Sequence, residues 1–141
     1  MAESSFLFAV LAALSWGIAP LFEKWGVLHT SPYFTLLVQS LVVSVALLAV
    51  GLESGQFQQV FSLNKQSWLF LAIAGLLSGL LAQMFYFKAL QHGEISRLIP
   101  LISSLQVVIA TVSASFVWGE TMNGMKVLGT LLIILGIYFI R

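Results

Sequence analysis

The sequence predicts an all-α integral membrane bundle of five transmembrane helices, and three observations support this fold class. Of the 141 residues, 60% are hydrophobic and only 8% are charged, whereas a soluble domain carries about 25% charged residues. The mean hydropathy is +1.02. The apolar residues also gather in runs long enough to cross a bilayer, which takes about 20 helical residues. So few charges could not cover a soluble fold of this length.

The five runs follow one another closely, and we expect them to form a single transmembrane domain over residues 1–141. They lie at about 5–27, 32–52, 66–90, 95–118 and 122–140. Four spans remain an alternative, with the first run lying at the membrane surface. No Lys or Arg precedes the first run, so we expect a retained span and not a cleaved signal peptide.

The first run contains a proline and an acidic residue. Pro20 cannot donate to the carbonyl of Trp16, so the helix is expected to bend there. Such a bend fits either a cavity beside Trp16 or an ordinary packing kink. Glu23 lies about 27 Å along the helix from Ser5, near the far interface. It is therefore either a proton-coupling carboxylate or half of an interfacial pair with Lys24.

The second and third runs carry a helix start and a packing motif. Ser31 and Pro32 are typical of an N-cap followed by the first helical residue. In the third run, Gly75 and Gly79 form the small-xxx-small pattern that allows two helices to approach closely. The approach could occur within one chain or between two chains.

The fourth run is the most polar, and a tight turn separates it from the fifth. Pro100 lies near its start, and its small polar side chains occupy two adjacent helical faces. They are Ser104, Thr111 and Ser115 on one face and Ser103, Gln106 and Ser113 on the other. These faces should meet a cavity or other helices and not lipid. In the turn, we expect Gly119 to end the fourth helix and Thr121 to cap the fifth, with Glu120 favoured by the helix dipole.

The sequence also argues against several classes of protein. It contains no cysteine, so it has no disulfide and no thiolate site. Its two histidines have no metal-ligand spacing, and we expect no metal and no cofactor. A net charge of +1 gives no indication of a nucleic-acid partner. Neither a phosphate-binding loop nor a nucleophile elbow is present, so we do not expect an enzyme.

Three stretches resemble a known family in their order and spacing. They are Ala13-Leu-Ser-Trp-Gly-Ile-Ala-Pro-Leu-Phe-Glu-Lys24, then Phe85-Tyr-Phe-Lys-Ala-Leu-Gln-His-Gly-Glu-Ile-Ser-Arg-Leu-Ile-Pro100, then Val117-Trp-Gly-Glu120 with Gly129 and Leu135-Gly136. Together they resemble the EamA domain of the drug/metabolite transporter superfamily over essentially the whole chain. Most relatives carry two fused domains, whereas this chain looks like the single-domain, five-span type. The resemblance implies a transporter, and the family consists mainly of exporters of metabolites and drugs.

The expected mechanism rests on uncharged groups in the middle of the membrane. Six residues are candidates for the substrate site: Trp16, Gln39, Ser44, Tyr86, Ser104 and Gln106. We expect alternating access, with helices rocking around Pro20 and Pro100, and a neutral, zwitterionic or aromatic solute. The main alternative is a proton/cation antiporter that resembles the small-multidrug-resistance type and uses Glu23. A membrane partner protein that transports nothing is a further alternative.

An odd number of spans constrains the assembly. Five spans place the two termini on opposite sides of the bilayer, and one such chain is small for enclosing a pathway. We therefore expect a homodimer in the inner or plasma membrane, and its subunits could be antiparallel. Basic residues favour a C-terminus on the cytoplasmic side, but weakly, so dual topology stays open. Lys24, Lys88, Arg97 and Arg141 lie on that side, against Lys65 and Lys126 on the other.

Overall fold

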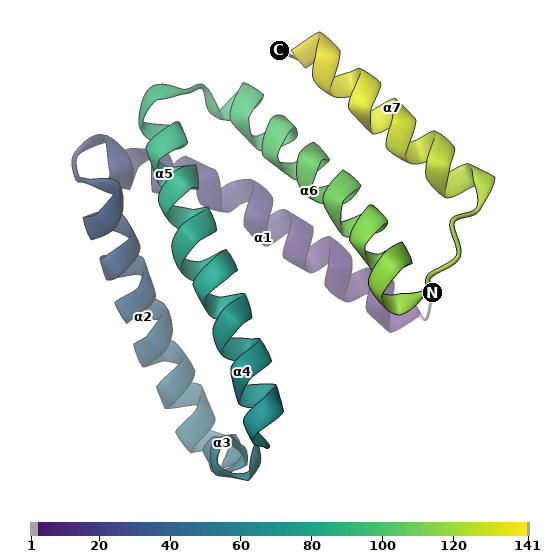
Figure 1. The fold of residues 1–141 in the computed structure, drawn as a ribbon. Coiled ribbons are helices and arrows are strands. Elements are labelled where there is room, and N and C mark those ends of the chain that lie inside the picture. The colour runs from purple at the N-terminus through teal and green to yellow at the C-terminus, as the bar shows by residue number, and fades with distance from the viewer. Residues whose placement is uncertain (1–2, 141) are drawn as a thin grey trace. The chain divides into compact units, whose positions relative to one another are not determined.

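The computed structural model describes residues 3–140, and its helices follow the five predicted runs (Figure 1). The expected and observed helix boundaries differ by two residues at most. The first two spans are α1 (Glu3–Leu28) and α2 (Pro32–Glu53), followed by the short helices η1 (Gln56–Gln58) and α3 (Gln59–Ser62). The third span consists of α4 (Lys65–Ala74), η2 (Gly75–Ala82) and α5 (Gln83–His92). The last two helices are α6 (Ile95–Trp118) and α7 (Gly124–Ile140).

These helices confirm the predicted fold class. Four of the described helices are long and apolar enough to cross a membrane. The fifth, α7, has 17 residues, which is at the short end of the range of about 17–25 residues for a spanning helix. The described residues contain helices and turns and no strand. The chain is therefore an all-α membrane bundle.

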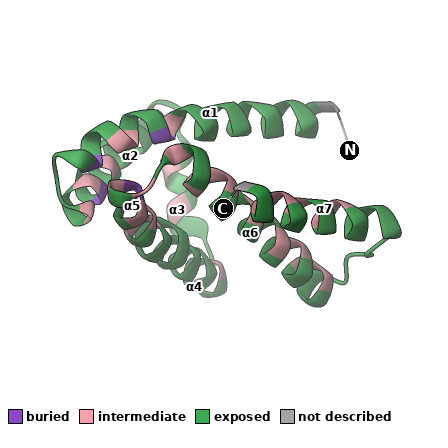
Figure 2. Cartoon of the chain, turned by 90° about the horizontal axis from the view of Figure 1, so that it is seen from above, coloured by how far each residue is buried: buried purple, intermediate pink, exposed green. Residues whose placement is uncertain are grey.

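The chain divides into two units at the turn between α5 and α6. In the first unit, α1, α2 and α5 contact one another. The buried positions of this unit gather where these helices meet (Figure 2), and its buried apolar side chains are Val27, Leu36, Phe87 and Leu90. In the second unit, α6 packs against α7. Most other apolar side chains of the spans are exposed, as expected for helices whose surroundings are lipid.

Two of the predicted helix boundaries have the expected caps. The hydroxyl oxygen of Ser31 accepts a hydrogen bond from the backbone N–H of Phe34 at 3.2 Å, and Pro32 begins α2. Gly119 ends α6 with φ of 63°, a left-handed conformation that glycine adopts without steric cost. α4 has a cap that was not predicted: the side chain of Asn64 accepts from the N–H of Ser67 at 2.7 Å.

The predicted cap of the last helix is wrong. α7 begins at Gly124, and the side chain of Asn123 accepts from the N–H of Lys126 at 2.9 Å. Thr121 therefore precedes the cap, because asparagine is the better N-cap residue and lies closer to the apolar run. Glu120 also lies outside the first helical turn. Its carboxylate instead pairs with the Lys126 ammonium at 3.7 Å.

The third span changes its helical winding in the middle. η2 is a π-helix of eight residues, and it contains Gly75 and Gly79. Its wider turn differs from that of the α-helices on either side. A methyl group added at either glycine would meet no described atom within 4 Å. Within its own unit, the chain therefore does not make the close approach that these glycines permit.

A side chain of α5 bonds to carbonyls at the C-terminal end of α1, and a side chain of α1 bonds to a carbonyl at the C-terminal end of α5. The Gln91 amide nitrogen donates to the carbonyl of Val27 at the end of α1 at 3.1 Å, and to that of Thr30 in the following turn at 2.9 Å. The Lys24 ammonium donates to the carbonyl of Leu90. The last carbonyls of a helix have no partner within the helix, and side chains can satisfy them. These bonds, which we call the helix-end clasp, fix the register of α5 against α1.

Replacing Gln91 with leucine should loosen the helix-end clasp. The Gln91→Leu variant removes two hydrogen bonds, and at ~0.6 kcal/mol for each interhelical bond in a membrane we expect about 1 kcal/mol of destabilisation. Unfolding in bicelles measures this change. Gln58→Leu, an exposed glutamine in η1, is the matched control and should change stability by less than ~0.5 kcal/mol. Equal stabilities of the two variants would contradict the role given to Gln91.

Candidate functional site

The carboxylate of Glu23 connects three helices of the first unit. The Gln39 amide nitrogen on α2 donates to Glu23 Oε1 at 3.1 Å. The Tyr86 hydroxyl on α5 donates to Glu23 Oε2 at 2.8 Å. All three side chains are half-buried. Hydrogen bonds to an ionised carboxylate are stronger than those between neutral groups, so this cluster, which we call the Glu23 triad, ties α1, α2 and α5 together.

The Glu23 triad lies one to two turns from the helix ends. At ~1.5 Å per residue, Glu23 lies about 8 Å before the end of α1 at Leu28, and Tyr86 lies about 9 Å before the end of α5. Gln39 lies about 10 Å after the start of α2. The three side chains therefore share one level along the helices. Glu23 and Tyr86 are nearer to the ends of their spans than to the middle, whereas Gln39 is nearer to the middle of α2.

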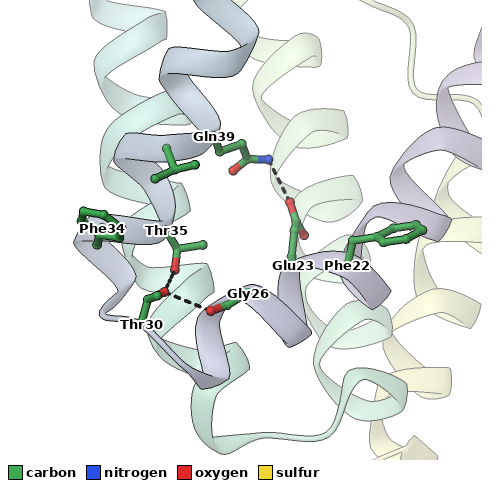
Figure 3. Close-up of a pocket in the computed structure, with 8 residues that line it drawn as sticks. Phe22, Glu23, Gly26, Thr30, Phe34, Thr35 and Gln39 are labelled. Carbon is green, nitrogen blue, oxygen red and sulfur yellow. Dashed lines mark hydrogen bonds between the residues drawn. The ribbon is translucent and has the colours of Figure 1, made fainter.

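A cavity of about 460 Å³ opens beside the Glu23 triad, between α1 and α2 (Figure 3). A cavity of this size suits a small molecule, since ligand pockets have ~300–1,000 Å³. Its lining is mostly apolar, with polar atoms at two places. The lining residues are Phe22, Glu23, Gly26 and Thr30 from α1 and the following turn, and Phe34, Thr35, Val38 and Gln39 from α2.

Tyr86 contacts Glu23 from outside this cavity. It belongs to α5 and is not among the lining residues, whereas Glu23 and Gln39 both are. The two carboxylate oxygens therefore have different partners: the tyrosine holds Oε2, and Oε1 bonds to an amide of the cavity wall. The hydroxyl fixes the orientation of the carboxylate, and the amide side of the group is the one that can meet a guest molecule.

The structure brings two of the six candidate substrate residues to Glu23, namely Gln39 and Tyr86. Trp16 lies about two turns earlier on α1 and is 76% exposed. Ser44 is exposed further along α2. Ser104 and Gln106 lie on α6, in the second unit. Ser104 is half-buried and donates to the carbonyl of Pro100, while Gln106 is exposed. The six residues therefore do not form one site within a single unit.

The two proline positions predicted for gating also lie in different units. α1 continues through Pro20, whose side chain is buried, and α6 continues through Pro100. Their role in gating stays a prediction.

Sequence reasoning missed most of the apolar lining and both threonines. A signal was present, because Glu23 and Gln39 lie equally far from Ser31 on its two sides. Two antiparallel helices joined by a short turn bring such equidistant positions to the same level. Phe34 and the two threonines lie closer to this turn, so the same count would have placed them in the cavity. Phe22 lies one residue farther from the turn than Glu23. Nothing comparable points to Tyr86 on the third span.

The second unit has a smaller cavity of about 310 Å³ between α6 and α7. Its charged groups, Glu120 and Lys126, pair with each other at 3.7 Å, so they offer little net charge to a guest. Among residues 3–140, no group of three or more acidic or histidine side chains could hold a metal ion. The Glu23 cavity is therefore the stronger candidate site.

Removing the Tyr86 hydroxyl should destabilise the protein through Glu23. We expect Tyr86→Phe to cost about 1 kcal/mol, with an upper bound of ~1.7 kcal/mol for one interhelical bond in a membrane. In a double-mutant cycle, the cost should shrink in the Glu23→Ala background, because the acceptor is already gone. Tyr33→Phe, at an exposed tyrosine of α2, is the control. Additive effects of the Tyr86 and Glu23 substitutions on unfolding in bicelles would contradict the coupling.

Comparison with known proteins identifies the family. The family model described as the EamA-like transporter family matches residues 4–141. A Sinorhizobium sp protein named "Uncharacterized transporter in cobO 3'region" is 31% identical over 136 residues, which cover 96% of this chain and 95% of the relative. No solved structure gives a significant match. With its apolar spanning helices and this match over nearly its whole length, the chain belongs to the EamA-like transporter family and is a multi-pass membrane transporter.

Proposed function

We propose that this transporter moves small organic amines with an apolar body, and that Glu23 binds their charged group. One observation carries the proposal: a carboxylate stands in the wall of a mostly apolar cavity. We therefore favour the cation-binding alternative over the uncharged central site that was expected from the sequence. The reason is that Glu23 joins Gln39 and Tyr86, two of the residues expected to bind substrate.

Electrostatics favours an ammonium group as the guest. The carboxylate receives hydrogen bonds from one amide and one hydroxyl, and both donors are neutral. A negative charge among apolar groups is costly unless it is paired. An ammonium entering beside Glu23 Oε1 supplies both the opposite charge and further donors. The apolar part of the solute then lies along Val38 and the rings of Phe22 and Phe34, which flank the cavity on either side (Figure 3).

The same carboxylate offers a way to couple transport to protons. Glu23 can hold either a proton or an ammonium group, since both neutralise the same charge. Proton entry would then release the amine, which makes export from the cell the natural direction in an inner or plasma membrane. We propose alternating access as the motion, with α1 flexing near Pro20 and α6 near Pro100, because neither proline donates the helical hydrogen bond of its position.

Transport of a lipophilic amine into proteoliposomes tests this function. Glu23→Gln keeps the shape of the side chain and removes its charge. Losing a charge-assisted interaction of ~1.5–3 kcal/mol should lower the transport rate at limiting solute by about tenfold or more. Glu53→Gln is the matched control, because Glu53 is an exposed carboxylate at the end of α2. Undiminished transport by Glu23→Gln would overturn the proposal.

A second candidate is a neutral, zwitterionic or aromatic solute bound along α6. It is favoured by Gln106, an exposed amide halfway along this span, since such a group in a membrane should meet a cavity or a partner. The half-buried Ser104 lies nearby on the same helix. The same assay separates the two candidates, because this one requires transport to survive Glu23→Gln and to fail with Gln106→Ala.

We also propose that two copies work together as a homodimer, parallel or antiparallel. In the described part of the chain, the buried apolar core consists of Val27, Leu36, Phe87 and Leu90. So small a core supports the proposal that helices of a second copy help to enclose a pathway. Gly75 and Gly79 are the contact we favour, because added methyl groups there would meet no described atom and small residues let helix backbones approach.

A bulky side chain at this contact should break the dimer without disturbing the monomer. We expect Gly79→Leu to weaken self-association by about tenfold, or ~1.4 kcal/mol, measured by energy transfer between labelled copies in liposomes. Leu80→Met, at an exposed neighbour, should leave association unchanged. Unaltered energy transfer in Gly79→Leu would place the contact elsewhere. Wild-type protein that neither self-associates nor moves solute would instead favour the alternative of a membrane partner protein.

A further inference from the structure

The Glu23 cavity has a second polar end, made by two threonine hydroxyls. Thr30 Oγ1 lies 2.6 Å from Thr35 Oγ1. Thr30 Oγ1 also lies 3.0 Å from the carbonyl oxygen of Gly26, and Thr35 Oγ1 lies 3.1 Å from that of Ser31. We call these two hydroxyls the threonine pair. Figure 3 shows the threonine pair across the cavity from Glu23 and Gln39.

A count of protons gives the hydrogen-bonding character of the threonine pair. Each hydroxyl has one proton to donate and two lone pairs that accept. The contact between the hydroxyls uses one proton, and a contact to a backbone carbonyl uses the other. No hydroxyl proton is then left for a guest without breaking one of these bonds. Toward the cavity, the pair therefore offers lone pairs and accepts hydrogen bonds.

The other polar end of the cavity also accepts. The ionised carboxylate of Glu23 has only acceptor atoms. One of the two N–H groups of the Gln39 amide already donates to this carboxylate. The Gln39 amide oxygen is buried and has no hydrogen-bond partner among the described residues. The last torsion of a glutamine is soft, so a small rotation lets this oxygen accept from a guest beside Glu23. A buried acceptor gains most when a donor reaches it.

We infer that the cavity selects solutes with a hydrogen-bond donor at each end, that is, amino alcohols and diamines. The inference rests on the proposed binding of an amine by Glu23. It adds a subsite at Thr30 and Thr35, which binds the hydroxyl or second amine at the far end of the solute. These two threonines thereby determine specificity, whereas Glu23 supplies the charge that any amine needs.

The spacing of the two ends sets the length of the solute. Thr35 and Gln39 are one turn apart on α2, about 6 Å along its axis. A linear chain of about five carbons spans this rise. The wall between the two ends is apolar, with Gly26 on α1 and Val38 on α2, and so it suits methylene groups. The volume of about 460 Å³ accommodates such a molecule.

Calorimetry on the purified full-length chain in nanodiscs tests the inference with aminopentanol and pentylamine. Wild-type protein should bind aminopentanol about fivefold more tightly, as one extra hydrogen bond of ~1 kcal/mol predicts. In Thr35→Val, which keeps the shape of the side chain, aminopentanol should bind no better than pentylamine. The affinity for pentylamine should stay within about twofold of the wild-type value. Thr30→Val should act in the same direction.

Three further measurements separate the possible results. Thr35→Ser retains the hydroxyl and should retain the preference, and Thr130→Val, in the second unit, should not affect it. Equal affinities of wild-type protein for the two amines would overturn the inference and leave the proposed function standing. This comparison needs no variant, so a substitution that impairs folding cannot obscure it. Amine binding that survives Glu23→Gln would refute the proposed function, and the inference with it.

Discussion

The arrangement of the first unit depends on one carboxylate that has to be satisfied away from bulk water. Lipid is as apolar as the side chains of a span, so apolar contact alone gives membrane helices little reason to prefer one neighbour. A half-buried charge does give such a reason, because its donors have to remain within reach. Gln39 on α2 and Tyr86 on α5 supply those donors from two directions. The buried side chains of Val27 and Phe87 and the helix-end clasp then hold the same helices in register.

In this arrangement, the three residues of the Glu23 triad have different roles. Tyr86 contacts the carboxylate from outside the cavity and can hold it in place while a solute binds and is released. Gln39 lines the cavity, so its bond to Oε1 competes with an incoming ammonium. Glu23 exchanges a neutral donor for a charged one, and only the cavity side has to rearrange. The three-helix junction can therefore persist during binding.

The sequence was sufficient for the fold class and for most helix boundaries, because these depend on local chemistry. Ser31 with Pro32 and the left-handed Gly119 are local signals, and both were predicted. The cap at Thr121 was wrong because Asn123 competes for the same role a few residues later. The π-helix in the third span escaped prediction, because the glycine spacing indicates packing and says nothing about the hydrogen-bond register of the backbone. The Glu23 triad was not predicted, because Tyr86 is distant from Glu23 in sequence. The position of a residue along one helix does not reveal its partner on another helix.

The asymmetry between making and losing hydrogen bonds explains how such a cavity can discriminate among amines. An extra methylene changes binding by only ~1–3 kcal/mol in an apolar pocket, whereas a missing donor leaves a polar group of the protein without its partner. Around the Glu23 cavity, the hydroxyl protons of Thr30 and Thr35 and one amide proton of Gln39 are engaged by the protein's own acceptors. The Glu23 carboxylate and the threonine oxygens accept, so a solute is selected by the donors it brings and by their separation. A solute with one donor satisfies the charge and leaves the threonine end unused, and one with two satisfies both ends without breaking the bonds of the threonine pair.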